Sequence, residues 1–351
     1  MVNSKFKKSR FGTLSDGKKV HIYTVSNGKM SFSATDFGCT ITSIIVPSKD
    51  GSKKDVVLGH STLAGFVNDT ACFGTAVGRF ANRIGGGSFT INGKKYELDK
   101  NDSGINCLHG GFDRFEKKVW KASKIKTEHG IGIEFTRFSP DGEQGFPGNA
   151  QVKVIYTLND NNELTFEYFL KTDKPTPVNL TNHSYFNLNG NGTVENHLLK
   201  LDSSAYLEVN DTVVPTGKII SLDEDKDFDF RSFKRIGQDI KNTGRGYDHA
   251  FLVDGWGDGK IHQIAVLKSE ETGISMTVST SLPAAQIYTA NFLEGTTGKF
   301  GRLYHNHDAL CIETEGYPDA PNHSDFPDCI VTPEKPYHEL SVYRFDFAEN
   351  V

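Results

Sequence analysis

The sequence has no run of apolar residues close to the roughly 20 that a helix needs to span a bilayer. Basic residues at 5–10, KFKKSR, are not followed by a hydrophobic segment, so the N-terminus does not resemble a secretion signal. We expect this short segment to be a solvated tail. These absences predict a protein that neither spans a membrane nor is exported.

Cysteine is scarce and scattered, which excludes a zinc ribbon and a disulfide framework. Two Asn-x-Ser/Thr sequons fall within the polar stretch 179–190, where a glycan would cover any site. We therefore expect a reduced, cytoplasmic location. The five cysteines form no C-x-x-C pair and lie at Cys39, Cys72, Cys107, Cys311 and Cys329.

An excess of positive charge is also absent. With 39 Lys and Arg against 44 Asp and Glu, the formal net charge is −5 at pH 7. This balance argues against nucleic acid or an anionic membrane as the main partner. No phosphate-binding glycine loop and no serine nucleophile elbow occurs. We expect a small-molecule partner, and a chain that is a monomer or a homodimer.

Helical periodicity is weak, and only 233–242 could form one short helix. Segments rich in β-branched and aromatic residues dominate, separated by Asn-Gly and other glycine turns. Many short antiparallel strands predict an all-β fold, a large β-sandwich or barrel. No linker is visible, so residues 1–351 are predicted to form a single domain. The expected strands lie within 29–47, a short buried strand at 55–59, and hairpins at 89–98, 150–172 and 264–281.

The stretch NLTNHSYFNLNG, residues 179–190, holds a histidine in a run that resembles a strand. With period 2, His183 shares one face with Thr181, Tyr185 and Asn187. A strand buried for packing alone would carry Val, Ile or Leu on its inward face. Here both faces mix hydrogen-bonding groups with aromatic surface, which makes His183 a candidate functional residue.

Polar residues of catalytic type gather in five segments that also contain glycines and aromatics. Arg, Asp, Asn and His side chains bind sugar hydroxyls, and aromatic rings cover the C–H side of a sugar. Singly, each has a plain structural reading: Arg83 as a surface or ion-paired arginine, His109 as a loop residue, Asp248 as a turn or cap. The segments are GRFANRIGGG (78–87), NCLHGG (106–111), NLTNHSYFNLNG (179–190), YDHAF (247–251) and CIETEGYPDAPNH (311–323).

Taken together, and in this order and spacing, these motifs resemble those of the aldose 1-epimerases, the galactose mutarotases. They extend from about residue 78 to 323, so the resemblance covers nearly the whole chain. It implies the galactose mutarotase-like supersandwich of antiparallel strands, in agreement with the strand pattern. The implied activity is interconversion of the α and β anomers of free aldohexoses such as D-galactose and D-glucose.

The resemblance also implies roles for single residues. His183, in NHSYFN, is similar to the family's general acid, and Glu313 is similar to its general base. His109, from LHGG, looks like the second active-site histidine. The residues that match the family's sugar-binding positions are Asn82, Arg83, Asp248 and Gln286.

One position departs from the family. The family usually reads Glu-Thr-Gln, whereas this chain reads Glu313-Thr314-Glu315. If the strand continues to Glu315, both carboxylates project from one face, and like-charge repulsion would raise the pKa of Glu313. In the alternative, the chain turns before Gly316 and sends Glu315 to solvent or to an arginine.

Anomer exchange needs one proton taken from the anomeric hydroxyl and one delivered to the ring oxygen. A carboxylate and an imidazolium suffice, so the resemblance implies no cofactor and no metal. We expect a nearby carboxylate to raise the pKa of His183 and keep it protonated. His305 and His307 could share a strand face and bind metal, but no third ligand is suitably spaced.

Three other functions remain open on this sequence. A glycosidase could use Asp248 and Glu313, although both histidines would then have no task. A hexose-6-phosphate epimerase should carry extra basic residues to hold the phosphate. A non-enzymatic sugar-binding protein would need the hydroxyl ligands but no acid–base pair.

Overall fold

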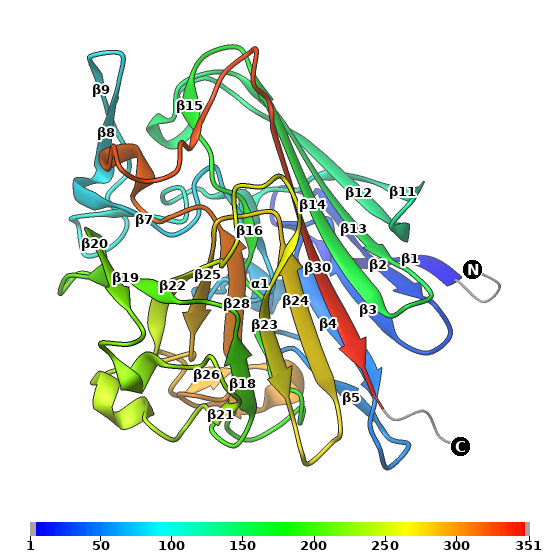
Figure 1. Ribbon diagram of the computed structural model, residues 1–351. Coiled ribbons are helices and arrows are strands. Elements are labelled where there is room, and N and C mark those ends of the chain that lie inside the picture. The colour runs from blue at the N-terminus through cyan, green and yellow to red at the C-terminus, as the bar shows by residue number, and fades with distance from the viewer. Residues whose placement is uncertain (1–4, 348–351) are drawn as a thin grey trace.

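The computed structural model describes residues 5–347 and consists mainly of antiparallel strands (Figure 1). Among these residues the one α-helix is α1 (Leu63–Val67), which begins at the Thr62 cap. Three large sheets account for most strands. The predicted all-β fold is confirmed.

The largest sheet has nine strands in the order β11-β12-β13-β14-β30-β24-β23-β18-β21. The last strand of the chain, β30, lies between β14 and β24 and so ties the C-terminal segment into the sheet. The strands are β11 (Lys121–Thr127), β12 (Gly130–Ser139), β13 (Ala150–Leu158), β14 (Glu163–Thr172), β18 (Leu198–Leu201), β21 (Lys234–Arg235), β23 (His262–Lys268), β24 (Ser275–Thr280) and β30 (Tyr337–Asp346).

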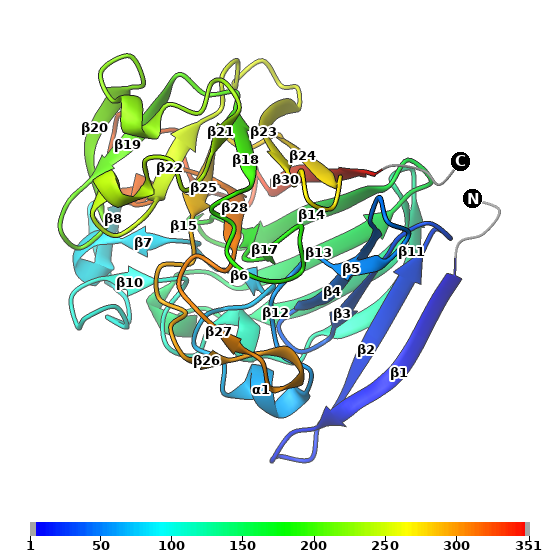
Figure 2. The same cartoon turned by 90° about the horizontal axis from the view of Figure 1, so that it is seen from below.

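A five-stranded sheet, β1-β2-β3-β4-β5, packs against strands β12 and β13 (Figure 2). Tyr23 of β2 meets the ring of Phe135 of β12 edge-on, with 6.4 Å between centroids. The segment 5–10 belongs to β1 and pairs with β2, so the expectation of a tail is wrong. The strands are β1 (Lys5–Thr13), β2 (Lys19–Ser26), β3 (Ser31–Thr35), β4 (Ile41–Pro47) and β5 (Lys53–Asp55).

The third sheet has six strands, β17-β28-β25-β22-β19-β20, and its middle strands face the candidate site. It joins the nine-stranded sheet through the core, where Phe186 stacks on Tyr343 at 5.6 Å. Its strands are β17 (Tyr185–Phe186), β28 (Leu310–Glu315), β25 (Ala284–Tyr288), β22 (Asp248–Leu252), β19 (Ala205–Val209) and β20 (Pro215–Ser221).

Short elements connect these sheets. The two-residue to four-residue strands pair as β6 (Ala76–Val77) with β16 (Thr181–Asn182), β7 (Arg83–Ile84) with β10 (Cys107–Leu108), β8 (Ser88–Ile91) with β9 (Lys94–Glu97), β15 (Thr176–Pro177) with β29 (Ile330–Val331), and β26 (Thr296–Thr297) with β27 (Leu303–Tyr304). The 3₁₀ turns are η1 (Gly85–Gly87), η2 (Phe115–Lys117), η3 (Glu143–Gly145), η4 (Lys226–Phe228), η5 (Ile240–Thr243), η6 (Lys299–Gly301) and η7 (Ala320–Asn322).

The local predictions are correct where the turn signal is strong and fail where it is weak. The hairpins at 89–98, 150–172 and 264–281 are confirmed as β8–β9, β13–β14 and β23–β24. The helix considered at 233–242 is wrong, because that segment holds β21 and the beginning of η5. The strand expected at 55–59 ends at Asp55, and beyond it Val57 makes only an isolated bridge.

Candidate active site

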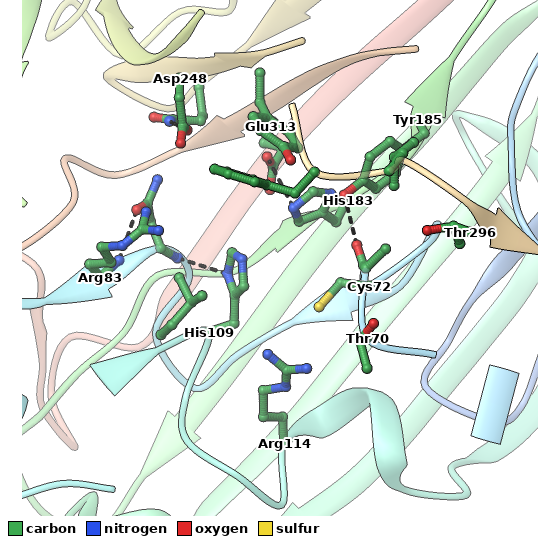
Figure 3. A pocket seen from close by; sticks show the side chains of 17 residues that line it. Thr70, Cys72, Arg83, His109, Arg114, His183, Tyr185, Asp248, Thr296 and Glu313 are labelled. Carbon is green, nitrogen blue, oxygen red and sulfur yellow. Dashed lines mark hydrogen bonds and ion pairs between the residues drawn. The ribbon is translucent and has the colours of Figure 1, made fainter. Parts of the chain in front are cut away.

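A cavity of about 280 Å³ lies against the six-stranded sheet (Figure 3). The segments that line it come from distant parts of the chain, including β7, β10, β17, β22, β25 and β28. All seven of the predicted site residues line it: Asn82, Arg83, His109, His183, Asp248, Gln286 and Glu313.

His183 lies between two short strands rather than within one. The stretch 179–190 divides into β16, which pairs with β6, and β17, which pairs with β28, so the prediction of one strand is wrong. Backbone bonds hold the histidine on both sides, because its N–H donates to the Thr75 carbonyl and its carbonyl accepts from Gly74. The imidazole is therefore placed by the junction of two sheets.

Three contacts orient the His183 ring. Its Nε2 lies 3.5 Å from Glu313 Oε1, and its Nδ1 lies 3.6 Å from Cys311 Sγ. The Tyr185 ring stacks on it at 5.0 Å with an angle of 17° between planes. Both His183 and Glu313 are buried, and Figure 3 shows them pointing toward one another at the cavity.

The His109 ring packs edge-on against the His183 ring, with 5.3 Å between the ring centroids. Its backbone is in the left-handed region (φ 53°), and Gly110 follows with φ 90°. A Cβ at Gly110 would lie 2.4 Å from the Gly78 carbonyl oxygen, so this turn requires glycine. Burial and the neighbouring His183 lower the pKa of His109 well below its usual value. His109 is thus a neutral imidazole at pH 7.

Asn82 and Arg83 face the cavity from the start of β7. Asn82 donates its backbone N–H to His109 Nδ1 at 3.1 Å and its side-chain amide to Glu315 Oε1 at 3.0 Å. Arg83 Nε donates to Asp102 Oδ2 at 2.9 Å. The reading of Arg83 as an ion-paired arginine is therefore correct, and its side chain also lines the cavity.

Three neighbouring strands place the remaining polar groups together. Gln286 of β25 is paired with Glu313 of β28 in register, which puts their side chains next to each other. Gln286 Nε2 donates to Asp248 Oδ1 of β22 at 2.6 Å. Burial raises the pKa of Asp248 above its usual value. The sheet thus presents two carboxyls and an amide to one cavity.

Strand β28 continues through Glu315, so the alternative in which the chain turns before Gly316 is wrong. Glu313 and Glu315 lie on the same strand face, as alternation requires, and both are buried. Only Glu313 lines the cavity. Glu315 lies beside it and holds Asn82.

Comparison with known proteins agrees with this geometry. The family model of aldose 1-epimerase matches residues 21–344. The chain belongs to the aldose 1-epimerase family. Galactose mutarotase of Mus musculus is 39% identical over 343 residues, which are 96% of this chain and 98% of the mouse protein. Aldose 1-epimerase of Escherichia coli K12 is 37% identical over 339 residues, 94% of this chain and 96% of that protein.

Solved structures support the same family and fold. A GalM/aldose epimerase homologue from C. elegans is 30% identical with a TM-score of 0.85, covering 99% of this chain and 100% of that one. A galactose 1-epimerase from Lactobacillus acidophilus, at 24% identity and a TM-score of 0.86, covers 99% and 100% and shows the shared fold. The predicted family and the prediction of an isomerase that interconverts aldose anomers are confirmed.

Burial dominates the acid–base chemistry of this epimerase. It lowers the pKa of His183 to about 4, so the expectation that a neighbouring carboxylate raises this pKa is wrong. Burial, and after it the proximity of the Glu315 carboxyl, raises the pKa of Glu313 well above its usual value. A proton shared between the two residues therefore favours Glu313 over His183.

Several residues of the cavity are absent from the sequence-based set. Arg114 lines it and pairs with Glu116 at 2.5 Å, and Tyr185, Tyr288 and Phe292 add aromatic surface. Phe292 is 69% exposed at the cavity. Tyr185 lies within the motif NLTNHSYFNLNG (179–190). No sequence pattern marks Arg114, which the turn after His109 brings to the cavity.

Two sets of residues could be considered for a metal ion. His183, Cys311 and Glu313 offer ligand atoms within 4.8 Å of one another. However, the thiol contacts Nδ1 and the carboxylate contacts Nε2, so the two lie at opposite nitrogens of one ring. His305 and His307 follow β27 and share no strand, and His305 instead contacts Glu294. Neither arrangement resembles a closed tetrahedral site.

Proposed function

We propose that the protein interconverts the α and β anomers of free aldohexoses such as D-galactose and D-glucose, with Glu313 as general base and His183 as general acid. The observation that carries this proposal is the 3.5 Å approach of His183 Nε2 to Glu313 Oε1 at one cavity. A carboxyl and an imidazole at this distance can exchange protons with a hydroxyl and a ring oxygen of the same sugar.

The reaction proceeds by two proton transfers. Glu313 takes the proton of the anomeric hydroxyl while His183 delivers one to the ring oxygen, and the bond between C1 and the ring oxygen breaks. The open-chain aldehyde then rotates about C1–C2. Closure reverses both transfers and forms the other anomer, so both residues return to their starting states.

The pKa shifts favour a protonated Glu313 and a neutral His183, which is the reverse of the pair that begins the reaction. A neutral imidazole with a protonated carboxyl holds the same single proton as an imidazolium with a carboxylate. Moving that proton from Glu313 to His183 therefore needs no exchange with solvent.

The surrounding polar groups fit a neutral, hydroxyl-rich ligand. Asp248, Gln286 and Asn82 offer acceptors and donors around the proton-transfer pair, and we assign them with Arg83 to hydroxyl binding. His109, as a neutral imidazole, is assigned to the same sugar as a second hydrogen-bonding residue. Phe292 offers an exposed ring to the C–H side of the substrate.

A phosphorylated substrate fits this cavity less well. Both arginines that line it already contact carboxylates, Arg83 with Asp102 and Arg114 with Glu116. A phosphate would need unpaired donors of this kind. The glycosidase and pure binding alternatives gain no support. A glycosidase would leave His183 and His109 without a task, and a binding protein would need no acid–base pair.

Polarimetry of freshly dissolved α-D-galactose and α-D-glucose tests the proposal directly. Catalytic amounts of protein should accelerate the approach to the equilibrium rotation. Saturation-transfer NMR between the two anomeric protons provides an independent rate. A rate equal to the spontaneous one for both sugars would refute the assignment.

We include the location, the domain organisation and the assembly of the protein in the same proposal. All five cysteines are unpaired, which supports a reducing, cytoplasmic location. Within residues 5–347, no helix has the length and apolar character to cross a membrane. We propose a single domain that acts on its sugar without cofactor, metal, membrane or nucleic acid, as a monomer or homodimer.

A further inference from the structure

Glu315 is an unusual group for its position. Glu315 is 0% exposed and lies at the end of β28, on the strand face that also carries Glu313. Oε1 accepts one hydrogen bond, from the Asn82 side-chain amide at 3.0 Å. Oε2 is buried without a hydrogen-bond partner among residues 5–347. An ionised carboxylate in this place would be poorly solvated.

The charged and titratable groups around Glu315 do not compensate an anion. Glu313 on the same strand and Asp248 on β22 are both acidic. Within residues 5–347, Arg83 is the cation that stabilises a charge on Glu315, and its Nε is bonded to Asp102. Tyr337 of β30 is close enough for Glu315 to raise its pKa, but its hydroxyl accepts from the Leu180 N–H, and Asn179 supplies a further amide to Glu315. Two neutral amides beside two acidic neighbours do not offset the cost of burying a charge.

We propose that Glu315 is a neutral carboxylic acid in the folded protein at pH 7, and that it positions Asn82 as a glutamine would. A protonated carboxyl has one carbonyl acceptor and one O–H donor, as an amide has one acceptor and a donor group. The departure from the family's Glu-Thr-Gln motif is thus conservative in chemistry. Consistent with this, burial raises the pKa of Glu315 to about 8.

The position of Glu315 explains how it acts on a cavity that it does not line. It holds the Asn82 side chain, and the Asn82 backbone N–H donates to His109 Nδ1 at 3.1 Å. As a neutral group it does this without placing a second negative charge beside Glu313. This inference rests on the proposed role of Glu313 as base, and it makes Glu315 a positioning residue.

The proposal changes the expected pH behaviour. If Glu315 were ionised near neutral pH, E315Q would lower the pKa of Glu313 and move the acidic limb of the pH–rate profile to lower pH. If Glu315 is protonated throughout the pH range of the acidic limb, E315Q and wild type carry the same charge at this position. Their acidic limbs should then superimpose.

Stability gives a second readout that does not depend on activity. A carboxyl whose folded pKa is raised releases its proton on unfolding between the unfolded and the folded pKa. Wild type therefore loses stability as pH rises from about 4.5 to about 8, and E315Q lacks this loss. The Tm of E315Q minus that of wild type should therefore increase across this range, whatever its sign at low pH. A merely structural role would give a difference that is independent of pH.

The experiment compares wild type, E315Q and E315A by galactose anomerisation between pH 5 and pH 9, after subtraction of the uncatalysed rate, and by thermal unfolding over the same range. E315A, which loses the anchor of Asn82, should lose roughly 10-fold to 10²-fold in kcat/KM at every pH, and E315Q should restore most of it. The control E163Q removes another carboxylate that accepts an asparagine amide, from Asn159 at 2.6 Å, outside the cavity.

Three results would overturn the proposal: an acidic limb of E315Q displaced to lower pH, a Tm of E315Q minus that of wild type that stays constant or decreases as pH rises, or an E315Q as inactive as E315A. Failure of the proposed function would look different. Wild type would then not accelerate anomer exchange at any pH, while the Tm comparison would still report the proton on Glu315.

Discussion

At the scale of single residues, the site depends on an imidazole whose two nitrogens face different partners. Cys311 and Glu313 lie at opposite nitrogens of His183, and the Tyr185 ring restricts its rotation. Such contacts fix the tautomer and angle of a histidine, which proton delivery requires. Both partners of His183 belong to β28, so one strand sets its geometry.

We predict that His183→Asn lowers kcat for galactose anomerisation by at least roughly 10²-fold, while galactose still binds, because only proton delivery is lost. Polarimetry gives kcat, and saturation-transfer NMR reports binding. His338→Asn is the control, since this histidine has a 56% exposed side chain on β30. Near-normal turnover of His183→Asn would show that another group is the acid.

We also predict that Glu313→Gln loses roughly 10²-fold to 10⁴-fold in kcat at every pH between 5 and 8. An amide cannot accept the proton of the anomeric hydroxyl, and raising the pH does not restore a base. The measurement is the pH–rate profile beside that of E315Q. An active Glu313→Gln together with an inactive E315Q would mean that the other carboxyl of β28 is the base.

At the scale of elements, the alternation of β28 decides which groups reach the cavity. Cys311, Glu313 and Glu315 project from one face, while Ile312 and Thr314 project from the other. On that second face, Thr314 Oγ1 hydrogen-bonds Ser341 of β30 at 2.7 Å. The strand therefore joins the site on one side to the nine-stranded sheet on the other.

The packing between sheets yields a prediction on stability. Phe135 of β12 is 0% exposed and meets the rings of Tyr23 and Tyr156 edge-on. Phe135→Ala should lower the free energy of unfolding by about 3–5 kcal/mol, because it leaves a cavity in the core. Chemical denaturation measures the change, and galactose kinetics should remain near wild type below the unfolding transition.

The same strand provides the matched control. Phe138 of β12 is 58% exposed, so Phe138→Ala should change the free energy of unfolding by no more than about 0.5 kcal/mol. Equal effects of the two substitutions would contradict the assignment of Phe135 to the core between the sheets.

At the scale of the whole molecule, one core cluster includes residues from Tyr23 to Phe345 and involves all three large sheets. The cavity lies where segments from the first, middle and last thirds of the chain meet. This arrangement supports the single-domain proposal, which stays a prediction. It also means that global unfolding and loss of the site should coincide.

Activity should not depend on a metal ion. Dialysis of the protein against a chelator is expected to leave the anomerisation rate unchanged, because two proton transfers complete the proposed reaction. The rate before and after dialysis, measured by polarimetry, is the check. A loss that zinc or manganese restores would contradict this prediction and point to the set of His183, Cys311 and Glu313.

The sequence alone determined the chemical identity of the site and the class of the fold. Motifs spaced along the chain identified seven residues, and all seven meet at one cavity. Hairpins with strong turn signals also formed as predicted. The residues were identified because the motifs resemble those of a family in order and spacing, and the hairpins because short-range turn geometry is a local property of the chain.

Only the tertiary structure decided what depends on distant neighbours. The split of 179–190 into two strands follows from their pairing with β6 and β28, and Arg114 reaches the cavity through a turn that no pattern marks. The pKa directions of His183 and Glu313 reverse the expectation of an imidazolium beside a carboxylate, because burial removes the water that stabilises both charges. Burial is a property of the folded whole, and neither spacing nor composition contains it.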